Sequence, residues 1–249
     1  MMQSDSSALT VGRRQLLHEL LSGGSGLLLA MFMWGHVLLV GSILTGARGF
    51  DWLATWLEDY YIAQPTVILV TALFLLHAMF ASRKIPAKLE ERRRMLRLSK
   101  NLRGDGRDAG VAAPFEPHLD SLLWIWQLRT GLVILVLGSF HLLLLALDVL
   151  TPVFGDRPGI ESATTLARVG GGLWPLYGLL LVSVEFHASV GLYRLAIKWG
   201  AGTRLSRRVL RQAERVLFWS ILGLGIVTLA VLAGWLPPPL AFLLEGGGS

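Results

Sequence analysis

Residues 24–46 read GSGLLLAMFMWGHVLLVGSILTG, an uncharged and mostly apolar run that contains one histidine, His36. An α-helix rises about 1.5 Å per residue, so about 20 apolar residues cross the roughly 30 Å of hydrocarbon in a bilayer. We therefore predict a membrane-spanning helix here. Runs of the same character predict four more spans, at about residues 64–82, 121–147, 172–195 and 216–236.

The composition of the whole chain agrees with this interpretation. Of its 249 residues, 53% are hydrophobic and only 16% are charged, whereas a soluble domain carries about 25% charged residues. The spans leave no stretch long enough for a separate nucleotide-binding or flavin-binding domain, so we expect one membrane-embedded domain over residues 1–249. Since the chain has no cysteine, it forms no disulfide, thiolate-held iron–sulfur cluster or c-type haem attachment.

Lysine and arginine alternate between the connections in a way that predicts the orientation of the helices. The second connection has ten of these cations and the fourth has seven, whereas the first has only Arg48. Basic connections usually stay on the cytoplasmic side. We therefore predict a cytoplasmic N-terminus and an external C-terminus, and we attribute the net charge of +6 to these connections, not to nucleic-acid binding. Within the second connection, residues 99–117 are expected to form a flexible loop.

Four of the six histidines lie within predicted spans, one in each of the first four: His36, His77, His141 and His187. An ionisable side chain inside a membrane is costly and indicates a functional site by default. For a single histidine, a satisfied interhelical hydrogen bond is an equally good explanation. One histidine on each of four successive helices favours a shared function.

The depths of these histidines sort them into two pairs. Because the first and third helices run outward and the other two inward, His36 pairs with His141 nearer the outside and His77 with His187 nearer the inside. Two stacked bis-histidine pairs are what two b-type haems require, whereas zinc or copper needs three or four ligands at one depth. We therefore predict an all-α membrane protein whose first four helices form a haem-binding bundle.

Small and polar side chains follow the histidines at helical intervals and suit a large flat cofactor. The glycines leave room for the edge of a macrocycle, and the polar groups at the inner ends are positioned to bind haem propionates. Small residues are also common at ordinary membrane helix interfaces, so a single glycine is weak evidence. The residues are Gly26 and Ser22 before His36, Gly138, Gly131, Gln127 and Trp124 before His141, and Gly191, Arg194 and Lys198 after His187.

Two carboxylates are candidates for proton transfer. Glu185 lies two residues before His187, so it faces roughly the other side of that helix. An acid at this depth is rare and often belongs to a proton relay, with a structural hydrogen bond as the alternative. Glu58 lies among tryptophans and tyrosines in the first connection. Two interpretations of it are equal: a solvated acid in an interfacial aromatic belt, or an acid that takes protons from a quinol beside an aromatic crevice near the outer haem.

Several motifs resemble one known family. VEFHASVGLYRLAIKWG (184–200), together with FMWGH (32–36), LHAMFASRKIP (76–86) and WIWQLRTGLVILVLGSFH (124–141), resembles the di-haem cytochrome b anchor subunit of fumarate reductases and related succinate:quinone oxidoreductases, especially the menaquinol-linked type. The likeness covers about residues 22–200, and the first motif is the most specific.

The resemblance implies a bacterial inner-membrane subunit with two b haems and menaquinone or menaquinol as its substrate. Dicarboxylate chemistry would belong to a cytoplasmic flavoprotein subunit, reached through an iron–sulfur subunit, often in a dimer of heterotrimers. The positions that match functional positions of the family are His36 and His141 for the distal haem, His77 and His187 for the proximal haem, Glu58 at the quinol-oxidation site, Glu185 for transmembrane proton transfer, and Ser22, Trp124 and Lys198 near propionates.

Three other functions share part of the pattern. A cytochrome b subunit of a membrane hydrogenase or formate dehydrogenase also has bis-histidine haems, but with a different number of helices and spacing of histidines. A proton-coupled transporter could use the histidines and Glu185 without haem, and a purely structural anchor would also lack it. A reduced-minus-oxidised spectrum separates the haem proteins from the last two.

Overall fold

The computed structural model describes residues 2–105, 119–154 and 159–245, and in these ranges it contains helices and no strand. Five helical stretches are long and apolar enough to cross a membrane, which confirms the predicted number of spans. The elements are α1 Met2–Gly41, η1 Ser42–Thr45, α2 Ala47–Asp59, α3 Ala63–Ser82, α4 Ile85–Asp105, α5 Leu119–Leu150, α6 Ser162–Arg168, η2 Val169–Leu173, α7 Trp174–Lys198, α8 Ala201–Arg204, α9 Arg207–Leu232 and α10 Phe242–Glu245.

Several helices differ in length from the predicted spans. Helix α1 begins well before residue 24, and α9 begins at Arg207, where the Ser206 hydroxyl accepts a hydrogen bond from the Val209 amide. Helix α9 ends at Leu232, four residues before the predicted end, and Gly234 follows with a φ of +75°. The expected loop was wrong for residues 99–105, which belong to α4; the rest of it, 106–117, lies outside the described residues.

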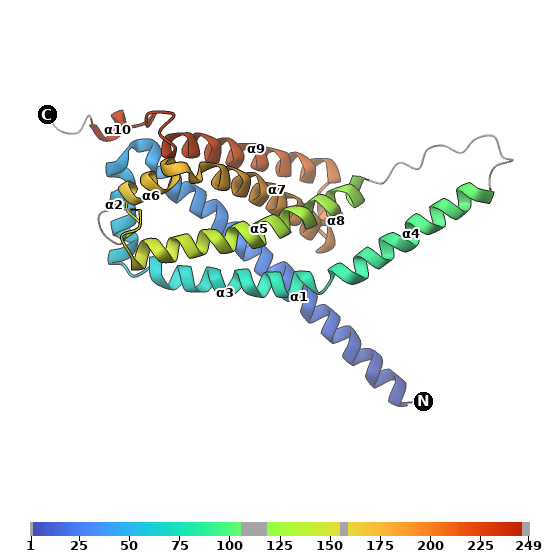
Figure 1. Ribbon diagram of the computed structural model, residues 1–249. Helices are drawn as coiled ribbons and strands as arrows, with labels where there is room; N and C mark the ends of the chain where they lie inside the picture. Colours follow the sequence, from blue (N-terminus) through green and yellow to red (C-terminus); the bar gives the residue numbers. More distant parts are fainter. Residues whose placement is uncertain (1, 106–118, 155–158, 246–249) are drawn as a thin grey trace.

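The five long helices α1, α3, α5, α7 and α9 form one bundle (Figure 1). Helix α7 packs against α5 and α9, and α1 packs against α3 and also contacts α7 and α9. The fifth span is therefore part of the packing around α7. The start of α1 and the whole of α4 project from one end of the bundle, whereas α10 lies at the opposite end (Figure 1).

The fourth span enters the bundle through a kink. It comprises α6, the π-helical turn η2 and α7, and Gly172 within the turn has a φ of +114°. Glycine adopts this backbone region without the clash that a Cβ would cause. Pro175 lies in the first turn of α7, where its missing N–H leaves no helical hydrogen bond unmade.

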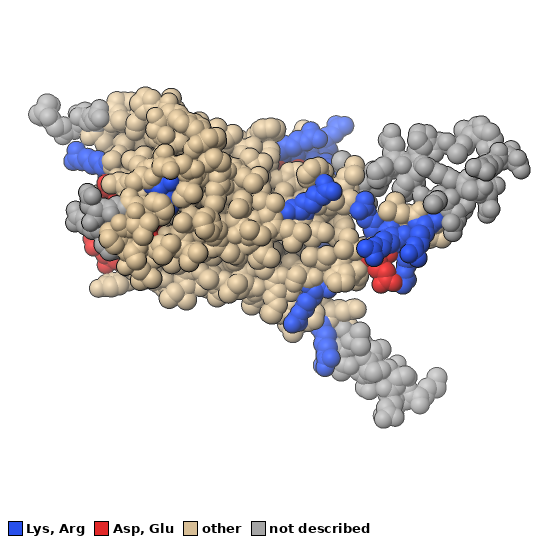
Figure 2. Space-filling view, in the orientation of Figure 1, with Lys and Arg blue, Asp and Glu red and all other residues tan. Residues whose placement is uncertain are grey.

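The surface of the bundle is apolar around its middle. Figure 2 shows a broad belt without charged side chains on the visible face, with most of the lysines and arginines toward the end from which α4 projects. Many large apolar side chains on the long helices are exposed, including Leu38, Ile68 and Val136 at 62%, 71% and 67%. Apolar surface of this extent needs a hydrocarbon environment, so the chain is a multi-pass membrane protein.

Candidate functional site

The structure brings His77 and His187 together from α3 and α7. The centroids of their imidazole rings lie 6.2 Å apart, and the ring planes are at 89°. Each ring is supported by a neighbouring helix, because α3 packs on α1 and α7 packs on α5.

His36 on α1 and His141 on α5 form a second pair with nearly the same spacing. Their ring centroids lie 6.3 Å apart, with the planes at 53°. Phe32 stacks on His36 with ring centroids 5.5 Å apart, and Tyr177 meets His141 edge-on at the same centroid distance. One further aromatic ring thus contacts each imidazole of this pair.

The spacing of the two pairs fits a metal between the rings of each. A metal–imidazole bond of about 2.0 Å plus roughly 1.2 Å from the nitrogen to the ring centre places two opposed imidazoles about 6.4 Å apart, centroid to centroid. The described residues contain no group of three or more potential ligands that could hold an ion. Each pair has the spacing at which two imidazoles could hold one metal ion between them.

Hydrogen bonds fix the ring orientation of the inner pair. The Nδ1 atom of His187 lies 2.8 Å from the carbonyl oxygen of Gln127, and that of His77 lies 3.1 Å from the carbonyl of Ser22 and 3.2 Å from the hydroxyl of Ser25. A backbone carbonyl only accepts, so Nδ1 carries the proton and Nε2 keeps its lone pair for a metal. The buried Nδ1 of His141 has no such partner among the described residues.

Two glycines make room for the inner histidines. A Cβ on Gly26 would lie 2.9 Å from Cε1 of His77, and a Cβ on Gly131 would lie 2.9 Å from Cε1 of His187. The sequence predicted that these glycines accommodate the edge of a macrocycle. In the structure, the nearest side chain to each glycine is the imidazole that comes from the helix packed beside it. The contact with a macrocycle stays a prediction.

A cavity of about 1030 Å³ runs through the bundle and contacts all four histidines. It exceeds the roughly 300–1,000 Å³ of ordinary small-molecule pockets. Its walls come from α1, α2, α3, α5, α7 and α9 and are mostly apolar. Such a space is large enough for a bulky ligand beside the histidines.

The polar residues that the sequence predicted as a propionate site all line this cavity. A guanidinium nitrogen of Arg194 donates to the side-chain oxygen of Gln127 over 3.0 Å. Lys198 forms an ion pair with Glu19. The residues brought together on the cavity wall are Ser22, Trp124, Gln127, Arg194 and Lys198.

Glu185 lines the cavity and is only 1% exposed. Neither of its carboxylate oxygens has a hydrogen-bond partner within the described part of the chain. Gly178 and Leu181 on the same helix contact α9 through Leu229 and Gly225, so Glu185 continues the row of residues on the α9 side of α7. A buried acid without a partner is a poor structural element, so packing alone does not explain Glu185 at this position.

Glu58 lies on the exposed side of α2, near its end. Helix α2 contributes Phe50, Leu53, Ala54 and Leu57 to the cavity wall, whereas Glu58 is not part of it. The neighbouring aromatic residues also point outward, with Trp52 68% and Tyr61 78% exposed. Glu58 therefore lies outside the cavity wall, and its role in taking protons from a quinol stays a prediction.

Sequence reasoning missed a buried ion pair near the outer histidines. Arg168 at the end of α6 pairs with Asp148 on α5, and these residues are 5% and 0% exposed. The guanidinium also lies 5.8 Å from the ring centroid of Tyr177, which contacts His141. The available signal was the position of Asp148 two helical turns after His141, on the same face of the helix.

The arrangement defines a class: a five-span helical membrane protein with two histidine pairs stacked along one internal cavity. Residues 111–232 match the family described as the succinate dehydrogenase/fumarate reductase transmembrane subunit. The chain is 34% identical to the fumarate reductase cytochrome b subunit of Wolinella succinogenes. The match covers 71% of this chain and 64% of the Wolinella protein, so the chain spans just under two thirds of that relative. It is 31% identical to the protein of the same name from Helicobacter pylori, over 83% of this chain and 76% of the relative. The chain therefore belongs to the succinate dehydrogenase/fumarate reductase transmembrane subunit family.

Proposed function

We propose that this chain is the membrane anchor and electron-transfer subunit of a quinol:fumarate reductase, which passes electrons between menaquinol and an iron–sulfur subunit through two b haems. The observation that carries the proposal is that the four histidines form two pairs, and that the ring spacing of each pair would leave room for one metal ion between the imidazoles. The names of the relatives, fumarate reductase cytochrome b subunits, agree with it.

The four histidines hold the two haems, His36 with His141 on the outer side and His77 with His187 on the inner side. When bound, haem iron accepts and gives up single electrons. The carbonyls of Ser22 and Gln127 orient the inner imidazoles, and the polar residues of the cavity wall bind propionates. These are Ser22, Trp124, Gln127, Arg194 and Lys198.

The two acids carry protons. Glu58 stands at the outer rim in contact with water, so it accepts protons from quinol and releases them outside. Electron transfer inward leaves charge separated across the membrane. Glu185, buried and without a partner among the described residues, offsets that charge by passing protons inward along the α9 side of α7.

The charge distribution supports the topology, and the names of the relatives support the partners. Basic connections on one side favour a cytoplasmic N-terminus and an external C-terminus, and we propose that the membrane is a bacterial inner membrane. The iron–sulfur and flavoprotein subunits dock on the cytoplasmic side and carry out the dicarboxylate chemistry, within a dimer of heterotrimers.

The test is a redox titration of the purified complex monitored by reduced-minus-oxidised spectra. The expected result is two b haems per chain, with one lost when His36 or His141 is replaced by alanine and the other lost with His77 or His187. A colourless protein, or variants that retain both haems, would overturn the proposal. Co-purification of a hydrogenase or formate dehydrogenase in place of a fumarate reductase would retain the haems but reject the complex.

A further inference from the structure

The inner end of the cavity has a cation just after α3, Lys84, that parallels those on α7. Arg194 lies seven residues, or two helical turns, after His187, and Lys84 lies seven residues after His77. The backbone stays near helical at Arg83, and both Lys84 and Arg194 line the cavity. Each inner histidine therefore has a cation two turns closer to the inner end of the cavity.

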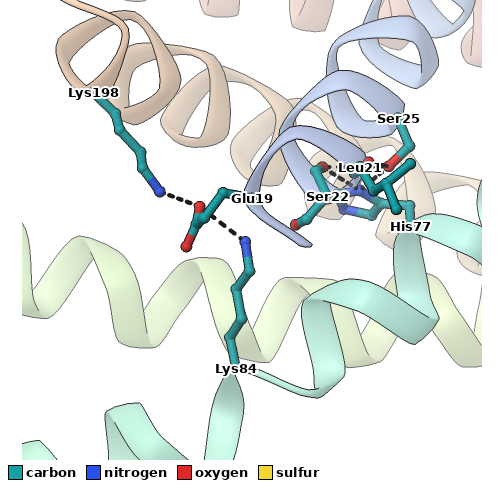
Figure 3. Close-up of polar contacts among 7 residues, drawn as sticks. All are labelled: Glu19, Leu21, Ser22, Ser25, His77, Lys84 and Lys198. Carbon is teal, nitrogen blue, oxygen red and sulfur yellow. Dashed lines mark hydrogen bonds and ion pairs between the residues drawn. The ribbon is translucent and has the colours of Figure 1, made fainter. Parts of the chain in front are cut away.

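Helix packing brings Glu19 between Lys84 and Lys198 (Figure 3). Helix α1 approaches α3 closely at Gly26, beside His77, and approaches α7 closely at Gly23, beside Leu195. Glu19 lies two turns before Gly26 and one turn before Gly23. These two close approaches place its carboxylate within reach of both lysines.

Both lysines use the same carboxylate oxygen. Lys84 Nζ lies 3.0 Å from Oε2 of Glu19, and Lys198 pairs with that same atom. Two ammonium groups repel each other, so one carboxylate between them is what keeps them close. The three side chains all line the cavity and together have one positive charge in excess, which is available to an anionic group inside it.

Stability alone does not explain this cluster. The side chains are partly exposed, 34% for Lys84, 40% for Glu19 and 50% for Lys198. Ion pairs of this kind contribute little to folding, whereas an excess positive charge at the inner end of a cavity attracts an anionic ligand.

We propose that Lys84 joins Lys198 as a second cation for the carboxylates of the inner haem, and that Glu19 is the positioning residue that holds both ammonium groups at the end of the cavity. This rests on the proposed function in one respect, that the anionic ligand is a haem propionate. A positive charge near the haem favours its reduced form, so Lys84 raises the potential of the inner haem and leaves the outer one nearly unchanged.

The experiment compares haem potentials in the purified complex with Lys84→Gln, Lys84→Arg and Arg83→Gln. Arg83→Gln is the matched control, because it removes the same charge one residue away. The guanidinium carbon of Arg83 lies 5.5 Å from the ring centroid of Phe80, and Arg83 is not part of the cavity wall. Lys84→Gln should lower the reduction equilibrium constant of the inner haem about tenfold, which is about 59 mV for one electron. Lys84→Arg and Arg83→Gln should change it by less than about threefold. The inner haem is identified as the one absent from a His77→Ala variant.

The positioning role of Glu19 is tested by combining substitutions. In a Glu19→Gln background Lys84 is no longer held, so adding Lys84→Gln should change the inner-haem constant by less than about threefold. A full tenfold effect there would reject the role of Glu19.

The outcomes separate this inference from the function on which it rests. Fewer than two haems in the unaltered complex would overturn the proposed function. Two haems with no shift in Lys84→Gln, with equal shifts of both haems, or with an equal effect of Arg83→Gln would overturn only the role of Lys84.

Discussion

Replacing Gly131 by alanine should remove the inner haem and leave the outer one in place. The new Cβ would lie 2.9 Å from Cε1 and 3.2 Å from Nδ1 of His187. Carbon atoms in comfortable contact are about 3.5 Å apart, so the imidazole must move by about 0.6 Å. The helix backbone of α5 cannot yield as easily as the ring.

That displacement matters because it acts on the hydrogen bond that orients the ring. The Nδ1–carbonyl distance to Gln127 is 2.8 Å, and a movement of about 0.6 Å stretches it to about 3.4 Å, past the useful range. Loss of a partner behind a metal-binding histidine typically costs about 10–100-fold in affinity. Overpacking costs about 1–3 kcal/mol, offset in part by about 1 kcal/mol of helix propensity, so the chain should still fold.

The assay is the haem-to-protein ratio and the reduced-minus-oxidised spectrum of membranes and of the purified chain. We expect about one haem per chain in Gly131→Ala, and the same in Gly26→Ala, where a Cβ meets His77 at the same distance. Gly35→Ala is the control, since its Cβ would have no neighbour within 4 Å although it adjoins His36. Two haems with an unchanged spectrum in Gly131→Ala would refute the reasoning.

Glu58→Gln should retain both haems and sharply lower quinol oxidation, because the carboxylate that accepts the protons is gone; normal turnover would exclude Glu58 from the mechanism. Glu185→Gln should also retain both haems and leave the fold as stable as before, because the carboxylate oxygens have no partner among the described residues. In this variant quinol-dependent fumarate reduction should fall, whereas fumarate reduction with an artificial electron donor on the cytoplasmic side should persist. Equal loss with both donors would argue against a role for Glu185 in proton transfer. Asp148→Leu should destabilise the protein by about 3–5 kcal/mol in thermal unfolding, because Arg168 is left buried and unpaired. The double variant Asp148→Leu/Arg168→Met should recover most of the lost stability. A double variant as unstable as Asp148→Leu would contradict this explanation.

Much of the fold could be predicted from the chain because the membrane limits the possibilities. A span needs about 20 apolar residues, and its direction alternates with each crossing, so the depth of His141 follows from its place along the third run. The kink before α7 could not be predicted in the same way. Residues 162–171 contain threonines and glycines that suit a loop, and their helical form depends on packing against η1, α2 and α9.

The candidate site likewise has features that the sequence predicts and features that depend on tertiary packing. The sequence by itself predicted that four histidines form two pairs at different positions along the helices, that an acid lies two residues before one of them, and that cations follow two turns after His187. Only the tertiary structure decided which groups meet: the carbonyl of Gln127 with His187, Gly131 against the same ring, and Glu19 between two lysines. The physical reason is that depth depends on distance along one helix, which residue counting supplies. Contacts between side chains depend on how neighbouring helices rotate and cross, which only their packing determines.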